Sequence, residues 1–135
     1  MNLVIDTNVL IAGLLRNSIT RRFLISKNIN FYIPEYAIQE IEKYKQYIID
    51  KSGLSENEFD ELFKLIIENL NIVPFEEMKS YTDQAKEIMK NIDIKDFPFI
   101  ACALYLKSGI FSYDEDFKKQ NVVRLYNIDE LNQYI

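Results

Sequence analysis

The sequence predicts an α/β domain with a largely parallel sheet and helices on both faces. Five short apolar runs alternate with longer stretches in which apolar residues recur at helical spacing. Strands separated by helices are joined by right-handed crossovers, which make neighbouring strands parallel. The 135 residues contain only 3 Gly and 3 Pro, too few for a turn-rich all-β fold. The length suits one domain, and because no linker, repeat or low-complexity stretch interrupts the chain, we assign residues 1–135 to it.

The expected strands are short, and most of them end at a polar residue or a proline. The first ends abruptly at Asp6, and the second and third are closed by Pro34 and Pro74. The fourth leads into the acidic sequence 114–116. We expect strands at residues 3–5, 31–33, 71–73, 110–112 and 122–125.

Helices are expected between these strands. Gly53 breaks one helical pattern, and Ser55 with Glu58 three residues later forms a capping box for the next helix. Asp96 is expected to cap a strongly apolar helix, in which Pro98 is acceptable because it falls in the first turn. The expected helices cover residues 8–15, a short segment around 23–25, a long segment at about 35–49, the apolar stripe 59–67, and residues 77–91, 97–107 and 128–134.

The chain is acidic. Its 16 basic and 21 acidic residues give a formal net charge of −5, the wrong sign for holding nucleic acid by bulk electrostatics. If the ligand is a polyphosphate, a locally bound cation must supply the positive charge.

The composition excludes several chemistries. The chain has no His, so triads, zinc sites and general bases that need imidazole cannot occur. The single Cys102 can form no internal disulfide, and its apolar neighbours favour a buried small residue over a nucleophile. The N-terminus has no signal-peptide pattern, and no stretch approaches the roughly 18 apolar residues of a membrane span. We therefore expect a soluble, cytoplasmic protein that does not associate with membranes.

Four acidic residues that are far apart in the sequence are expected to converge at one edge of the sheet. Open parallel sheets bind ligands beyond the carboxyl ends of their strands, where the strand order switches. Asp6 directly follows the first strand, and Asp114 lies just past the fourth. Glu40 lies in the second turn of the helix after the second strand, and Asp96 opens the helix that leads into the fourth.

Such a group of carboxylates suits one or two Mg²⁺ or Mn²⁺ ions, which prefer oxygen ligands. Bound ions of this kind polarise a phosphoryl oxygen and activate water, so the site suits phosphodiester hydrolysis. Each acid also has a plainer interpretation: Asp6 and Asp96 could cap helices, Glu40 could be a solvated helix residue, and Asp114 could belong to an ordinary acidic loop. Because all four fall at the same sheet edge, we favour the metal site.

Four segments resemble the PIN-domain family, compact nucleases that include the VapC-type toxins of toxin–antitoxin pairs. The segments are LVIDTNVLIAGLL at 3–15, IPEYAIQEIEKY at 33–44, DFPFIACALYL at 96–106 and IFSYDEDF at 110–117. Each motif is weak by itself. Together, in this order and spacing, they are quite specific, and they span nearly the whole chain.

The resemblance implies a three-layer α/β/α fold with a five-stranded parallel sheet. It also implies a metal-dependent ribonuclease that cleaves RNA, often as a homodimer. A toxin would have a small antitoxin protein as its partner. PIN domains also act in RNA processing and decay, so a nuclease that is not a toxin is an open alternative.

By position, the resemblance assigns roles to seven polar residues. Asn8 and Ser112 would support the site by hydrogen bonds, Asn8 by orienting the first carboxylate. Ser112 stands where the family usually has Thr, which keeps the hydroxyl. The catalytic and metal-binding acids would be Asp6, Glu40, Asp96 and Asp114, with Asp116 as an auxiliary acid at the metal.

Cationic and aromatic side chains near the expected site are candidates for RNA contact. An ordinary solvated surface would explain the cationic clusters equally well. The candidates are Arg16, Arg21, Arg22, Tyr36, Tyr113 and Lys118.

Two further interpretations are open. An aspartate-phosphorylating hydrolase or a receiver-like protein would also place Asp6 after the first strand, but the second Asp typical of the hydrolases is Asn8 here, and no suitable Lys stands out. A non-catalytic module could keep the fold and bind RNA or a protein. Magnesium-dependent cleavage that is lost in Asp6→Asn or Asp96→Asn would distinguish an enzyme from this module.

Overall fold

A parallel five-stranded sheet forms the centre of the molecule, with the strand order β3-β2-β1-β4-β5. The structure is a computed structural model that describes residues 1–15 and 18–135. Each neighbouring pair of strands is parallel, which confirms the predicted sheet. The strands are β1 (Asn2–Ile5), β2 (Asn30–Pro34), β3 (Leu70–Val73), β4 (Gly109–Phe111) and β5 (Leu125–Tyr126).

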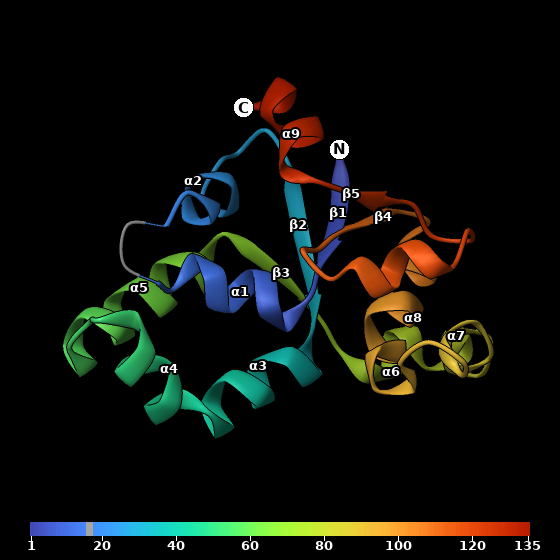
Figure 1. Cartoon of the computed structure of the whole chain (residues 1–135), viewed down its shortest axis with the longest axis horizontal. Coiled ribbons are helices and arrows are strands. Elements are labelled where there is room, and N and C mark those ends of the chain that lie inside the picture. The colour runs from blue at the N-terminus through green and yellow to red at the C-terminus, as the bar shows by residue number, and fades with distance from the viewer. Residues whose placement is uncertain (16–17) are drawn as a thin grey trace.

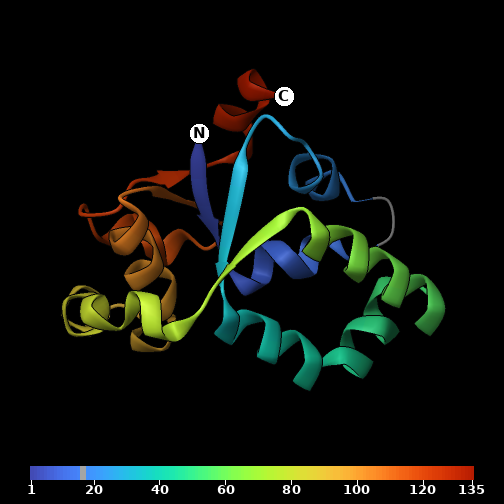
Figure 2. The same cartoon turned by 180° about the vertical axis from the view of Figure 1, so that it is seen from behind.

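Helices flank the sheet on two sides and complete three layers. Figures 1 and 2 show helices α1 to α5 on one side of β1 and β2, and α6 to α8 on the other. The first group is α1 (Thr7–Gly13), α2 (Thr20–Leu24), α3 (Glu35–Lys43), α4 (Lys45–Ser52) and α5 (Glu56–Glu68). The second group is α6 (Phe75–Met78), α7 (Thr82–Met89) and α8 (Phe97–Leu106), and α9 (Ile128–Leu131) lies near the C-terminus. Short 3-10 helices complete the chain: η1 (Lys79–Tyr81), η2 (Ile94–Asp96), η3 (Glu115–Lys119) and η4 (Asn132–Tyr134).

Apolar residues on both sides of the central strands form the core. Leu3, Val4 and Ile5 of β1 are at most 1% exposed, as expected for a strand that helices cover on both faces. Helix α8 packs against β1, β2 and β4, and its residues 98–103 are all buried. This burial explains why the helix is apolar on every side.

The two longest predicted helices are interrupted in the structure. The helix expected at 35–49 breaks at Tyr44, whose φ of −105° and ψ of 19° separate α3 from α4. Both halves have helical sequences, so the break is not visible in the apolar spacing. It turns α4 toward α5, where Lys45 lies 2.9 Å from the Asp60 carboxylate. The helix expected at 77–91 is likewise divided into α6, η1 and α7.

The strand predicted at 122–125 is also wrong in extent, because β5 covers only Leu125 and Tyr126. The Gln120 side chain explains the difference. Its amide oxygen accepts a hydrogen bond from the Val123 backbone nitrogen at 2.9 Å, and its amide nitrogen donates to the Val123 carbonyl at 2.7 Å. These bonds fold the chain around the Gln120 side chain, so residues 121–123 form a bend before β5 begins. The capping box at Ser55 and Glu58, in contrast, is confirmed.

The strand order switches between β1 and β4. The chain adds β2 and β3 on one side of β1, and then β4 and β5 on the other. Ile5 pairs with Phe111 in the register, so the next residues, Asp6 and Ser112, lie side by side at the carboxyl edge of the sheet. Both chain termini lie at the opposite end of the molecule (Figure 1). None of the helices in the described part of the chain is long and apolar enough to cross a membrane.

Candidate active site

Asp6 is the most enclosed of the four predicted acids, with 4% of its surface exposed. Its Oδ1 accepts a hydrogen bond from the Val9 backbone nitrogen at 2.9 Å, so the residue does cap α1. Its Oδ2 accepts a 2.5 Å hydrogen bond from the Ser112 hydroxyl. Burial raises the pKa of Asp6, the bonds from Ser112 and Val9 lower it, and the nearby charge of Asp114 raises it further. Asp6 therefore caps α1 and also lies close enough to Asp114 to feel its charge.

Ser112 links Asp6 to the acidic loop after β4. Its hydroxyl oxygen also accepts a hydrogen bond from the Asp114 backbone nitrogen at 2.9 Å. The Asp114 carboxylate in turn accepts one from the Asp116 nitrogen at 2.9 Å and begins η3. The short strand thus ends in a chain of hydrogen bonds that fixes the loop against Asp6.

Glu40 reaches the same edge from α3. Its Oε1 accepts a 2.7 Å hydrogen bond from the Thr7 hydroxyl in the first turn of α1. These residues are 33 positions apart in the sequence, so the bond fixes α3 relative to α1. Thr7 was absent from the residues predicted for the site.

Asp96 stands at the N-terminal end of α8, but its side chain makes no capping hydrogen bond there. Asp96 therefore occupies the N-cap position, but the prediction that its side chain caps the helix was wrong. The half-buried carboxylate has no hydrogen-bond partner within the described parts of the chain. Burial and the nearby charges of Asp93, Asp114, Asp6 and Glu40 raise its pKa from 3.8 to about 7. A carboxylate in this state is available to a cation.

Asp6, Glu40 and Asp96 line one cleft of about 270 Å³. Helix α1 contributes Thr7, Asn8 and Ile11 to it, and Tyr44, Tyr47 and Ile48 line it from the α3–α4 segment. Asp114 is not among the residues that line this cleft, although its charge acts on both Asp6 and Asp96. The four acids are therefore electrostatic neighbours that come from four separate segments.

The donor set suits a hard divalent cation in kind and charge, since all the candidate groups are carboxylates and Asp6 and Asp96, one buried and one partly buried, are close enough to repel each other. The spacing is more open than that of an assembled metal site. Among residues 1–15 and 18–135, no group of three or more acidic or thiol side chains is close enough to hold a metal ion. A cation would have to draw these side chains together.

Comparison with known proteins identifies the family. Residues 4–134 match the PIN domain. The chain belongs to the PIN-domain family. No curated protein matches it. The chain is also similar in structure to one described as VapBC2 from Rickettsia felis bound to a DNA fragment from their promoter, with a TM-score of 0.68. The identity is 17%, over 94% of this chain and 98% of that chain, a level at which the likeness shows the fold alone.

The structure also places Asn8, predicted to support Asp6, and Asp116, predicted as an auxiliary acid, in this PIN domain. Asn8 is exposed and lines the cleft, but its side chain makes no hydrogen bond to Asp6 in the described structure. Ser112 and the Val9 nitrogen orient that carboxylate instead. Asp116 is engaged by Lys119, whose Nζ lies 2.8 Å from its Oδ1.

The candidates for RNA contact differ in whether their side chains are exposed or already bonded to other residues of the protein. Arg21 donates hydrogen bonds to the carbonyls of Gly13 and Leu15, at 2.8 and 2.6 Å, and so ties α2 to the end of α1. The Tyr113 hydroxyl is hydrogen-bonded to Thr20, and Lys118 is paired with Glu115 at 2.7 Å. Arg22 and Tyr36 are exposed, and Arg16 lies outside the described residues.

Two tyrosines at the mouth of the cleft were missed by the sequence analysis. Tyr44 is 50% exposed and Tyr47 is 58% exposed, although both line the acidic cleft of this PIN domain. Their spacing of three residues would place them on one face of a continuous helix. The break at Tyr44, which the sequence pattern does not reveal, decides where that face points.

Proposed function

We propose that this PIN domain is a divalent-metal-dependent endoribonuclease that hydrolyses RNA phosphodiester bonds at the acidic cleft. The observation that supports this most directly is the state of Asp96. Its carboxylate has no partner in the described structure, opens onto the cleft, and has a pKa raised to about 7 by burial and by four neighbouring acids. An arrangement that costs stability without a ligand is typical of a functional site.

In this proposal Asp6, Glu40, Asp96 and Asp114 hold one or two Mg²⁺ or Mn²⁺ ions, with Asp116 as an auxiliary acid. A bound ion would supply positive charge to the phosphate and activate a water molecule. The protein groups position these acids: Ser112 orients Asp6, and Thr7 orients Glu40. Asp96 must lose its proton before it can bind a cation, so it couples ion binding to pH near neutrality.

The test is cleavage of single-stranded RNA with Mg²⁺ or Mn²⁺ and with EDTA. We expect cleavage that requires the ion and falls at least about a hundredfold in Asp6→Asn and Asp96→Asn. Asp83→Asn, which changes an exposed acid in α7, is the matched control and should cleave normally. Cleavage that is equal in all of these proteins would contradict the proposal.

A non-catalytic RNA- or protein-binding module is the second candidate. It is favoured by the absence, in the described residues, of three acids close enough to hold an ion. RNA binding without turnover at any metal concentration, and unchanged in Asp96→Asn, would support it.

We further propose that the enzyme is the toxin of a VapBC-type pair, with a small antitoxin protein as partner and a homodimer as its assembly. The structural similarity to VapBC2 motivates this proposal. Expression alone should arrest growth, co-expression of a small protein encoded next to it should relieve the arrest, and Asp6→Asn should not arrest growth. An active nuclease that leaves growth unchanged would instead indicate a role in RNA processing or decay.

A further inference from the structure

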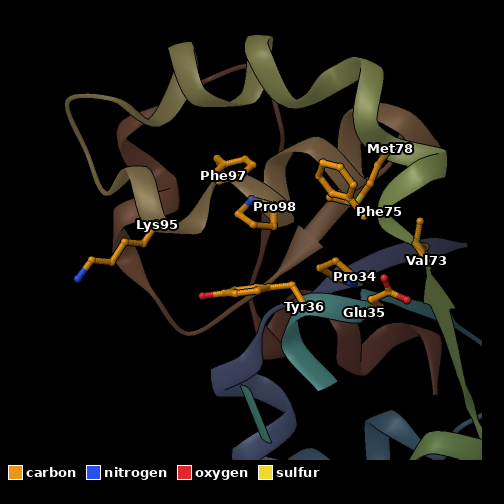
Figure 3. Close-up of a pocket in the computed structure, with 9 residues that line it drawn as sticks. All are labelled: Pro34, Glu35, Tyr36, Val73, Phe75, Met78, Lys95, Phe97 and Pro98. Carbon is orange, nitrogen blue, oxygen red and sulfur yellow. The ribbon is translucent and has the colours of Figure 1, made fainter. Parts of the chain in front are cut away.

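A second cavity, of about 320 Å³, is lined mainly by apolar and aromatic side chains, with Glu35 and Lys95 as its charged residues. Figure 3 shows the Tyr36 ring and Pro34 on one side of it, and Phe75, Phe97 and Pro98 on the other. Its volume is within the range of small-ligand sites, about 300–1,000 Å³. The proposed metal chemistry does not use this cavity.

The cavity and the acidic cleft are lined by neighbouring residues of the same parts of the chain. Tyr36 lines the cavity, and its ring centroid is 6.5 Å from that of Phe99, which lines the cleft. Asp96 lines the cleft, while its sequence neighbours Lys95 and Phe97 line the cavity. The two sites are therefore adjacent in the structure.

The side chains of the cavity suit a flat, partly polar group. Tyr36 and Phe75 are 41% and 43% exposed, so their rings are accessible for stacking. The Tyr36 hydroxyl and the Lys95 ammonium group point to the same side of the cavity (Figure 3). Lys95 forms no ion pair with the acids that the structure describes. Aromatic rings with a free cation beside them are the usual means of binding an unpaired base and its phosphate.

We propose that this cavity is a subsite for one unpaired nucleobase of the RNA whose neighbouring phosphate lies in the acidic cleft. The base stacks on Tyr36 and Phe75, and Lys95 contacts the backbone. This inference rests on the proposed ribonuclease function and assigns the selection of one base beside the cut to the residues of this cavity. An apolar side chain of a partner protein would not need the lysine or the adjacent cleft.

The test uses a pool of short single-stranded RNAs of random sequence, cleaved by the full chain and sequenced at the new ends. We expect a base preference at one position beside the cut. Phe75→Ala should flatten that preference and lower the cleavage rate of the preferred sequence roughly ten- to a hundredfold. Tyr134→Ala removes an aromatic ring of similar exposure (40%) near the C-terminus, at the opposite end of the molecule, and should change neither.

A binding measurement separates stacking from turnover. An RNA of the preferred sequence with 2-aminopurine at the selected position should lose fluorescence when it binds the Asp96→Asn protein. This loss should be absent when the RNA binds the double variant Asp96→Asn with Phe75→Ala. Cleavage by Phe75→Ala with an unchanged preference would overturn the subsite but leave the nuclease standing. Unchanged RNA cleavage by Phe75→Ala, together with loss of its binding to the antitoxin, would likewise overturn the subsite but not the nuclease. Cleavage of no RNA by the wild type would overturn the proposed function, and this inference with it.

Discussion

The Ser112 hydroxyl donates a 2.5 Å hydrogen bond to Oδ2 of Asp6, across the switch between β4 and β1. The two residues are 106 positions apart in the sequence and both are 4% exposed. With the Val9 nitrogen on Oδ1, each oxygen of the Asp6 carboxylate is held by a donor. The bond therefore fixes a buried acid at the edge of the sheet where the other acids arrive.

Replacing Ser112 should affect both stability and activity. Ser112→Ala leaves one oxygen of a buried carboxylate without its donor, which we expect to cost about 1–3 kcal/mol of unfolding free energy. It should also lower the cleavage rate, because the orientation of Asp6 is less restricted. Urea denaturation and RNA cleavage measure the two effects. Ser112→Thr keeps the hydroxyl, so equal losses in the Ala and Thr variants would show that the hydrogen bond has no role.

Asp96→Asn should stabilise the metal-free protein in a pH-dependent way. The pKa of the folded state, about 7, lies above the ordinary 3.8, so folding favours the protonated form. The stability associated with that form is complete below about pH 4 and is lost as the pH rises to 7. The variant cannot ionise, so its advantage should grow over this interval and then level off.

We expect an advantage of about 1–2 kcal/mol at pH 8, after allowing for solvent screening of a half-buried group, and little at pH 4. Urea denaturation in EDTA at both pH values measures it. Asp83→Asn is the matched control, since its carboxylate is exposed. An advantage of the same size at both pH values would argue against a raised pKa at Asp96.

Adding Mn²⁺ should raise the thermal stability of the wild type. An ion at about 100 times its dissociation constant stabilises the folded state by about 2.7 kcal/mol. The gain should be smaller at pH 5.5 than at pH 8, because Asp96 is then mainly protonated. Differential scanning calorimetry of the wild type, Asp6→Asn and Asp83→Asn measures it. The proposed site predicts a reduced gain in Asp6→Asn only, and equal gains in all three would place the ion elsewhere.

Arg21 and Arg22 should have separate roles despite being adjacent. Arg21→Ala removes the hydrogen bonds to Gly13 and Leu15 and should cost about 1–2 kcal/mol of stability. The exposed Arg22 should instead contribute to RNA affinity, so Arg22→Ala should keep stability and weaken binding most at low salt. Denaturation and salt-dependent RNA binding separate them. The assignment fails if Arg21→Ala folds as stably as the wild type.

The sequence was sufficient to predict the layered α/β fold, because periodicity, caps and apolar runs are local signals. Buried strands such as β1 must be apolar, and Ser55 with Glu58 begins α5 wherever that helix lies. It was not sufficient to predict the break at Tyr44, because the apolar spacing continues from α3 into α4. Nor did it predict the shortening of β5, where the Gln120 side chain holds the preceding residues in a bend.

The sequence also nominated the acids, since each follows a strand or opens a helix at the same edge. The tertiary structure decided how each one is held: Asp6 by Ser112, Glu40 by Thr7, and Asp96 by no partner in the described chain. The physical reason is that residue type and spacing specify which groups arrive at an edge. Burial, pKa and hydrogen bonding depend on neighbours up to 106 positions away, and only the folded chain brings these together.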